Sequence, residues 1–401
     1  MPPSPSRGTP PAVLFLVNSL RTGGAEKQLI SLLNHLDTHR FRLHLAYLKR
    51  GEPLLPQLER ARLAGLVCLD VRHRVDVGAV RRLRRLVADE AIEAIVCTNA
   101  YPTLYGYLAR RARSGRPARL ATVFHSTALL THRERAQMLL YRPLFNRCDR
   151  LIYVCESQRH YWRDNGVHPA ADQVIYNGID TQWHCDPRAP AEQLRFRRSL
   201  GFGDEDFVIG LCGAFRPEKA HGDLLAAAAT LRARAVPAKV LLIGDGPQRP
   251  AIERCARRLG IREHVLITGM RRDVRPFVRA CDVMTLVSHT ETFSLAALES
   301  MSLGKPLVMS ELGGAAEQVV HGEHGFLFAP GDIEALAMHL RALTSRELRR
   351  RLGEAAARRV RERFTIQGMT ARFTECLAGL TEGGRELPRP PRTPLSSWAP
   401  P

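Results

Sequence analysis

The sequence is poor in lysine, poor in aromatic residues and free of long apolar runs. No stretch of eighteen or more apolar residues occurs, so no transmembrane helix is expected. Nine cysteines are present, but none forms a Cys-x-x-Cys pair, and several lie in apolar, strand-like segments. This placement favours reduced core thiols in a cytoplasmic protein, and it disfavours disulfide or metal-ligating roles.

Arginine supplies most of the charge of the chain. The sequence has 59 basic residues against 40 acidic ones, for a formal net charge of +19. A basic surface attracts phosphorylated ligands, acidic lipid headgroups or nucleic acid. No helix-turn-helix, zinc-finger or aromatic-rich binding motif accompanies the charge, so we predict no nucleic-acid partner. The arginine cluster at 349–363 is expected to be a solvated helix face.

The length of 401 residues exceeds the size at which one hydrophobic core stops growing, so two domains are expected. Strand-like and helix-like segments alternate throughout, which predicts an α/β protein with parallel sheets. We predict two Rossmann-like domains facing each other across an inter-domain cleft, at residues 12–190 and 200–362. Residues 1–11 and the proline-rich 388–401 are predicted to be a disordered arm and tail. The strands are expected near 12–17, 41–47, 66–69, 94–97, 119–124, 151–154, 173–175, 207–212, 239–243, 264–267, 283–287, 306–309 and 325–328.

Two carboxylates, Glu291 and Glu299, flank a predicted strand-to-helix turn. The strand at 283–287 is followed by a helix at 294–303, with Ser294 as its N-cap. Glu291 then lies at the carboxyl end of a parallel strand, where open α/β sheets bind ligands. The free N–H groups of the helix N-terminus suit a phosphate, and the carboxylate suits sugar hydroxyls. For an isolated pair of glutamates, a turn cap and a solvated helix face would be the simpler interpretation.

The first glycine loop argues against a nicotinamide dehydrogenase. Gly23 and Gly24 follow the first strand without the Gly-x-Gly-x-x-Gly fingerprint, and Tyr47-Leu48-Lys49 stands where an acidic residue would end the second strand. Two adjacent glycines still permit a close backbone approach to a phosphate or a sugar. His125 ends an apolar strand, and alone it would be interpreted as a structural histidine.

Eight segments in this order resemble the retaining nucleotide-sugar glycosyltransferases of family 4, which have the GT-B fold. The resemblance extends from about residue 12 to 380 and is specific for the family, but not for its substrates. The segments are Gly23-Gly-Ala-Glu26, Val123-Phe-His125, 174–180, Phe215-Arg-Pro-Glu-Lys219, 240–247, Glu291 with Glu299, Gly313-Gly-Ala-Ala-Glu317 and 325–332.

The resemblance implies a donor site made by both domains. Arg216 and Lys219 would bind the donor diphosphate, which implies no metal and no cofactor besides a UDP- or GDP-sugar. Glu299 would bind the ribose, and Glu291 the hydroxyls of the donor sugar. His125 would face the anomeric carbon, so that His125 and Glu291 are the predicted catalytic residues. The other predicted donor-binding residues are Gly23, Gly24, Phe293, Ser294 and Leu295.

The resemblance also implies a reaction and a setting. A hexosyl unit would move with retention to a glycan or lipid-linked acceptor, in the synthesis of a bacterial surface polysaccharide, lipopolysaccharide or glycolipid. The departing phosphate oxygen would assist deprotonation of the acceptor. A C-terminal helix at 363–382 would cross back to the first domain.

Three alternatives stay open at this point. A sugar-nucleotide epimerase of the same fold would convert the donor without an acceptor, and a non-catalytic subunit would only bind it.

Residues 126–147 mix apolar and basic side chains, which is typical of an interfacial helix or of an ordinary helix packed on a sheet. The first interpretation predicts a peripheral contact of the basic N-terminal domain with the inner membrane.

Overall fold

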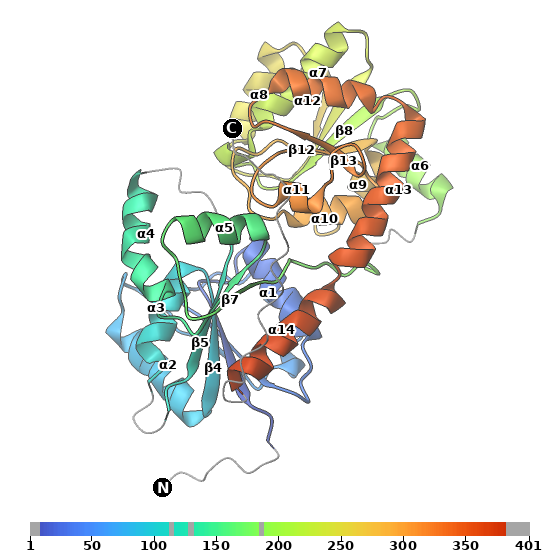
Figure 1. The fold of residues 1–401 in the computed structure, drawn as a ribbon. Coiled ribbons are helices and arrows are strands. Elements are labelled where there is room, and N and C mark those ends of the chain that lie inside the picture. Colours follow the sequence, from blue (N-terminus) through green and yellow to red (C-terminus); the bar gives the residue numbers. More distant parts are fainter. Residues whose placement is uncertain (1–8, 112–115, 127–131, 184–187, 382–401) are drawn as a thin grey trace.

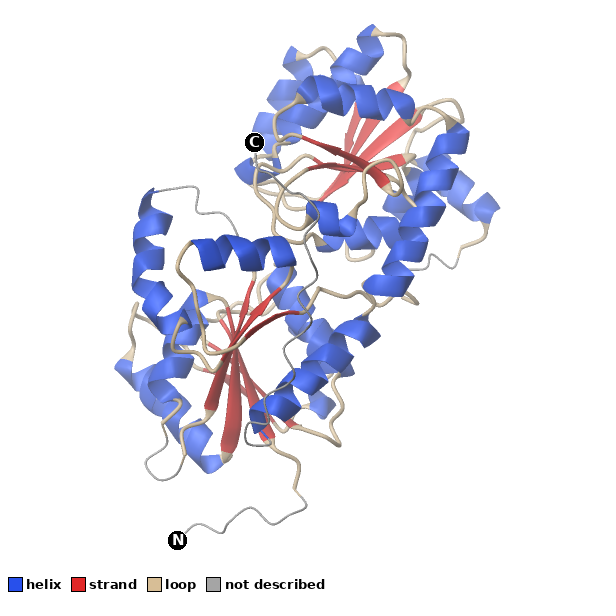
Figure 2. Ribbon diagram, viewed as in Figure 1, coloured by secondary structure: helices blue, strands red, loops and turns tan. Residues whose placement is uncertain are grey.

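The computed structural model describes residues 9–111, 116–126, 132–183 and 188–381, without the side chains of 132–135. The chain forms two α/β lobes, and each has a parallel sheet between layers of helices (Figure 1, Figure 2). The predicted fold class is confirmed. Most of the predicted arm (1–11) and all of the predicted tail (388–401) lie outside the described residues.

The first lobe contains a seven-stranded sheet in the order β3-β2-β1-β4-β5-β6-β7. All six residues of the interior strand β1 are buried and apolar, as expected for a parallel strand covered on both faces. The elements are β1 (Ala12–Val17), α1 (Gly24–His35), β2 (Arg42–Tyr47), η1 (Leu55–Gln57), η2 (Arg60–Arg62), β3 (Gly65–Cys68), α2 (Val77–Asp89), β4 (Ile92–Thr98), α3 (Ala100–Ala109), β5 (Arg119–Phe124), α4 (His132–Phe145), β6 (Arg150–Tyr153), α5 (Glu156–Asp164) and β7 (Asp172–Val174).

The second lobe contains a six-stranded sheet in the order β10-β9-β8-β11-β12-β13. Its elements are α6 (Pro190–Ser199), β8 (Phe207–Cys212), η3 (Pro217–Lys219), α7 (His221–Ala233), β9 (Ala238–Ile243), α8 (Arg249–Arg258), η4 (Arg262–His264), β10 (Val265–Ile267), α9 (Arg275–Ala280), β11 (Val283–Leu286), α10 (Leu295–Ser302), β12 (Leu307–Ser310), α11 (Ala315–Gln318), β13 (Gly325–Phe328), α12 (Ile333–Ala342) and α13 (Arg346–Arg363).

The C-terminal helix α14 (Ile366–Thr381) lies on the first lobe beside α1, whereas α13 packs against α10 of the second lobe (Figure 1). The chain changes lobe where Ile179 forms a parallel bridge with Thr365. Gly178 is required at this crossing, because a Cβ there would lie 2.3 Å from the carbonyl oxygen of Thr365.

Glu317, from the Gly-Gly-x-x-Glu segment, joins the two lobes. Its carboxylate accepts the backbone N–H groups of Glu156 and Ser157 at 2.9 and 2.8 Å, and the Tyr176 hydroxyl at 2.8 Å. The second lobe thereby caps the N-terminus of α5 in the first lobe, where a negative charge is favourable. Burial, together with the Glu317 charge, raises the pKa of Tyr176.

We expect Glu317→Ala to loosen the contact between the lobes. The substitution leaves two amide donors and one hydroxyl without their acceptor, so the amides of Glu156 and Ser157 should exchange about tenfold faster with solvent or more. Hydrogen exchange with mass spectrometry measures this rate. Glu311→Ala is the matched control, because this exposed carboxylate has no partner among the described residues. Equal exchange in both variants would remove the bridging role of Glu317.

Candidate functional site

The strand order of each sheet reverses at one point, and the two reversal points carry the predicted site residues. In the first sheet the order reverses between β1 and β4, and in the second between β8 and β11. Ligands of open α/β sheets bind beyond the carboxyl ends of the strands at such points. The loops after β8 and β11 carry Lys219 and Glu291, respectively.

Lys219 and Glu291 form an ion pair at the reversal point of the second sheet. The Lys219 Nζ and the Glu291 Oε2 are 2.6 Å apart, and their side chains are 26% and 20% exposed. The Ala220 residue that follows Lys219 has a φ of 46°, a left-handed conformation that turns the chain sharply into α7. The structure thus brings together a predicted diphosphate ligand and a predicted sugar ligand.

Arg216 faces the first lobe. Its side chain is 57% exposed, with Glu218 3.9 Å from the guanidinium. Burial raises the pKa of Glu26 in α1, and the charge of Arg216 opposes this rise. A cation of the second lobe therefore acts on the first turn of α1 across the boundary between the lobes.

Helix α10 begins at the predicted N-cap. The Ser294 hydroxyl accepts the Ala297 N–H at 3.4 Å, which confirms the cap. However, the Ser294 N–H donates to the Gln318 Oε1 at 3.1 Å, so this amide is already engaged. A donor contact of Ser294 stays a prediction, and in this conformation its N–H is held by Gln318.

Phe293 and Leu295 differ from Ser294, because the described residues contain no hydrogen-bond acceptor for their N–H groups. The Phe293 ring packs on Tyr176 and Phe364 at the crossing between the lobes, with centroid distances of 5.3 and 5.5 Å. Its side chain therefore supports the lobe contact, and its carbonyl oxygen accepts from the Asn177 Nδ2 at 3.3 Å, so only its backbone N–H is available to a ligand.

The glycine loop of the first lobe meets α10. A Cβ at Gly23 would lie 2.2 Å from the Glu26 carboxylate, and a Cβ at Gly24 would lie 3.9 Å from the Leu295 Cδ1. The N-termini of α1 and α10 therefore approach each other from opposite lobes. Both termini offer unpaired N–H groups and positive dipole ends, which suits an anion placed between them.

Glu299 lies one helical turn further along α10, near the end of β8. Burial is the main cause that raises the pKa of Cys212 to about 12, and the charge of Glu299 adds to it. The charge of Lys27 in α1 opposes this rise. Glu299 is half-buried and close to the same boundary as Arg216. Binding of the ribose by Glu299 stays a prediction.

His125 follows β5 in the first lobe, and its backbone N–H donates to the Asn99 Oδ1 at 2.9 Å. Burial lowers the pKa of His125 to about 4, so the imidazole is neutral at pH 7. Asn99 has φ 67° and ψ 177°, a conformation that costs about 1–3 kcal/mol in a non-glycine residue. Strain of this kind is concentrated at functional sites, and sequence reasoning did not single out Asn99.

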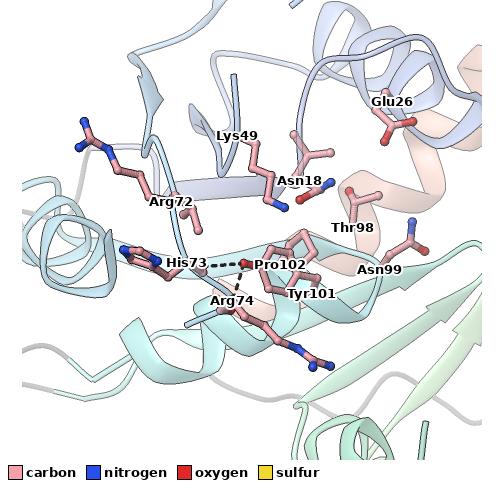
Figure 3. Close-up of a pocket in the computed structure, with 12 residues that line it drawn as sticks. Asn18, Glu26, Lys49, Arg72, His73, Arg74, Thr98, Asn99, Tyr101 and Pro102 are labelled. Atoms are coloured by element: carbon pink, nitrogen blue, oxygen red, sulfur yellow. Dashed lines mark hydrogen bonds between the residues drawn. The ribbon is translucent and has the colours of Figure 1, made fainter. Parts of the chain in front are cut away.

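A cavity of about 630 Å³ lies at the reversal point of the first sheet (Figure 3). Its polar lining includes Glu26, on which the charge of Arg216 acts, and Asn99, which accepts the backbone N–H of His125. The sequence prediction missed this cavity, although Lys49 stood out there as an unusual end for the second strand. The other lining residues are Val17, Asn18, Lys49, Val71, Arg72, His73, Arg74, Thr98, Tyr101 and Pro102.

No cluster of three or more metal-ligating side chains occurs in the described part of the chain. An Asp-x-Asp triplet, Asp204-Glu205-Asp206, directly precedes β8. It therefore lies at the amino end of this strand, whereas Lys219 and Glu291 follow the carboxyl ends of β8 and β11. Its carboxylates pair with Arg198 and Lys239. The described cysteines are free thiols.

The predicted interfacial segment 126–147 contains helix α4, and residues 127–131 lie outside the described residues. Leu139 and Leu140 of α4 are 62% and 75% exposed, unlike the side chains of a fully packed helix. None of the helices described has the length and hydropathy needed to span a bilayer. Contact with a membrane stays a prediction.

Two family profiles match the chain, one on each lobe. "Glycosyltransferase Family 4" matches residues 22–183, and "Glycosyl transferases group 1" matches residues 192–359. The paired parallel sheets and the residues that meet between them define the class of protein: a glycosyltransferase of the GT-B type. The chain belongs to glycosyltransferase family 4, as the resemblance implied.

Curated relatives support the family and differ in their substrates. N-acetyl-alpha-D-glucosaminyl L-malate synthase of Bacillus anthracis is 30% identical over 52% of this chain, and the match spans 54% of that protein, about half its length. A GDP-mannose-dependent alpha-(1-6)-phosphatidylinositol monomannoside mannosyltransferase of Mycolicibacterium smegmatis is 28% identical over 75% of this chain and 80% of its own.

Solved structures share the fold. HepE of Anabaena, crystallised in complex with UDP, superposes with a TM-score of 0.79 at 23% identity, over 92% of this chain and all of that chain. The lipopolysaccharide glycosyltransferase WaaG superposes with a TM-score of 0.71 at 17% identity, over 93% of this chain and all of that chain. At these identities the likeness establishes the GT-B architecture.

Proposed function

We propose that this protein transfers a hexosyl unit, with retention of configuration, from a UDP- or GDP-sugar to a glycan or lipid-linked acceptor. The observation that carries the proposal is the Lys219–Glu291 pair, 2.6 Å apart, at the reversal point of the second sheet. A cation for phosphate and a carboxylate for hydroxyls stand side by side, as a sugar diphosphate requires.

Donor binding would exchange this internal pair for two contacts with the ligand. The diphosphate takes the ammonium of Lys219 and the guanidinium of Arg216, while the N–H groups of Phe293 and Leu295 point toward the same anion. Glu291, released from Lys219, accepts from the hydroxyls of the sugar. Glu299 then holds the ribose. No metal is needed, because side-chain cations and helix N-termini neutralise the leaving diphosphate.

The acceptor side would be the first lobe. His125 is neutral at pH 7 and can hydrogen-bond the donor sugar near its anomeric carbon without repelling the positive charge that develops there. The departing phosphate oxygen then removes the proton of the acceptor hydroxyl on the same face of the sugar. Both nucleotides stay in the proposal, because HepE was crystallised with UDP and the mycobacterial relative is named for GDP-mannose.

The setting proposed is the cytoplasm of a bacterium, where the enzyme would build a surface polysaccharide, a lipopolysaccharide or a glycolipid. A peripheral contact with the inner membrane would bring it to a lipid-linked acceptor. The exposed Leu139 and Leu140 of α4 support such a contact.

A donor screen tests the proposal. The full chain is incubated with a panel of UDP- and GDP-sugars and a mixture of acceptors, and released nucleotide is measured. We expect one donor class to release nucleotide in an acceptor-dependent manner, and NMR of the product to show the anomeric configuration of the donor. Conversion of the donor to an epimer without acceptor, or failure to bind either nucleotide by calorimetry, would overturn the assignment.

A further inference from the structure

The cavity beyond β1 and β4 separates its charges. Figure 3 shows Glu26, Thr98 and Asn99 at one end, with Arg72 and His73 at the other. The Lys49 side chain extends into the middle of the group, beside Asn18 and over the ring of Tyr101. A ligand in this cavity therefore meets neutral and acidic groups at one end, and cations at the other.

The cations of this cavity are poorly neutralised by the protein. Within the described residues, neither Lys49 nor Arg74 has a carboxylate within ion-pair distance; the Lys49 Nζ lies 5.4 Å from the centroid of the Tyr101 ring. Arg72 has Asp70 at 3.7 Å, but Asp70 also pairs with Arg50 at 3.0 Å. This excess of positive charge lies around a recess, where the field is stronger than on an open surface.

The loop that carries the arginines is held against the cavity. The Tyr101 hydroxyl donates to the carbonyl oxygens of Arg74 and His73, at 3.1 and 3.4 Å. The Arg72 N–H donates to the Asp76 carboxylate at 3.2 Å. The backbone of 72–74 is therefore fixed, while the three side chains are exposed and free to turn toward a ligand.

The opposite end of the cavity offers groups for hydroxyls. The Asn18 Oδ1, between Lys49 and this end of the cavity (Figure 3), is buried and has no hydrogen-bond partner in the described part of the chain, which is costly unless a ligand donates to it. Thr98 is buried beside it. Asn99 lies at the same end and holds the backbone of His125. The hydroxyl end of a ligand would thus lie nearest to the predicted site of sugar transfer.

We propose that the acceptor is a polyol or sugar that carries an anionic group, a phosphate monoester fitting best. Its reacting hydroxyl lies toward Glu26 and Asn99, and its anion lies toward Lys49 and the arginines of 72–74. A dianion matches the two cations without a carboxylate among the described residues, Lys49 and Arg74, together with the weakly paired Arg72, better than a single carboxylate does. The inference rests on the proposed function, because it names the substrate class of the acceptor side of the same cleft.

Lysine footprinting tests the inference, because the chain has only five lysines, at positions 27, 49, 219, 239 and 305. The full chain is acetylated with a water-soluble reagent, and the rate at each lysine is followed by mass spectrometry. The probes are glucose, glucuronate and glucose 6-phosphate, which share one ring and differ in charge. We expect glucose 6-phosphate to slow the modification of Lys49 about tenfold, glucuronate to slow it less and glucose not at all. Lys239, remote from the cavity, should react at an unchanged rate.

Variants and vesicles complete the test. The double substitution R72A/R74A should weaken the protection of Lys49 at least about fivefold, whereas Arg85→Ala, which removes an exposed arginine of α2 outside the cavity, should not change it. Phosphatidylcholine vesicles that contain phosphatidic acid, whose headgroup is a phosphate monoester, are compared with pure phosphatidylcholine vesicles and replace the sugar phosphate in a second arm. Protection by the free sugar phosphate indicates a soluble acceptor, and protection by the anionic vesicles alone indicates a lipid phosphate.

The same measurement separates this inference from the proposed function. UDP or GDP should protect Lys219, whatever happens at Lys49. Protection of Lys219 without any charge-dependent protection of Lys49 overturns the anionic acceptor and leaves the transferase proposal standing. The reverse pattern overturns nucleotide binding at Lys219 and leaves the anion site in place.

Discussion

Lys219→Ala and Glu291→Gln are each expected to lower sugar transfer by about a thousandfold while the fold survives. The Lys219→Ala variant lacks the cation that would stabilise the negative charge developing on the diphosphate as the diphosphate leaves. Glu291→Gln keeps the shape of the side chain but removes the charged acceptor for the sugar hydroxyls. Initial rates of nucleotide release, with the donor found in the screen, measure both effects.

Lys239→Ala is a closely matched control for Lys219→Ala. Lys239 also pairs with a carboxylate of the second lobe, Asp206, at 3.4 Å, and its side chain is 25% exposed, against 26% for Lys219. Losses of thermal stability should be similar for the two variants, because each leaves one carboxylate unpaired. Only Lys219→Ala should lose transfer. Equal activity of the two variants would remove Lys219 from the donor site.

His125→Ala is expected to lower kcat by about a hundredfold, with a smaller effect on donor binding. The reason is that the imidazole would act near the anomeric carbon, where charge develops only during the reaction. Burial lowers the pKa of His125 from 6.5 to about 4, so the imidazole takes up a proton only when the pH falls to about 4. The rate should therefore show no inflection from this histidine between pH 5 and 8, and should decline as the pH approaches 4.

Steady-state kinetics and a pH profile of kcat check the His125 prediction. His35→Ala is the control, because this exposed histidine ends α1 in the same lobe and lies outside the cavity lining. A His125→Ala enzyme with normal kcat would make His125 a structural residue, which is the role that its position at a strand end would suggest by itself.

Much of the fold could be predicted from local pattern. The thirteen expected strands all appear within three residues of their predicted limits. Short apolar runs such as Ala12–Val17 and Phe207–Cys212 are typical of parallel strands buried between layers of helices. The N-cap at Ser294 and the helix after it could be predicted for the same reason: both follow from neighbouring residues.

The contacts of the site could not be predicted in this way. Lys219 and Glu291 were assigned to different parts of one ligand, but their direct pairing depends on β8 and β11 being neighbours in the sheet. The engagement of the Ser294 amide by Gln318 also escaped prediction, because the two residues are 24 positions apart and meet through the packing of α11 against α10. The strain at Asn99 has no counterpart in local sequence, since asparagine is common in turns.

The amino-acid sequence by itself determined the α/β architecture, the two lobes and the family, because these depend on hydrophobic periodicity and on short segments whose order along the chain is sufficient. Tertiary structure alone decided which charges face each other, that Glu317 caps a helix of the other lobe, and that Lys49 and the loop 72–74 surround a recess. The physical reason is the distance along the chain between the residues that interact. Strand and helix formation depends on neighbouring residues, whereas ion pairs and cavities depend on the order of strands in a sheet and on the docking of one lobe against the other.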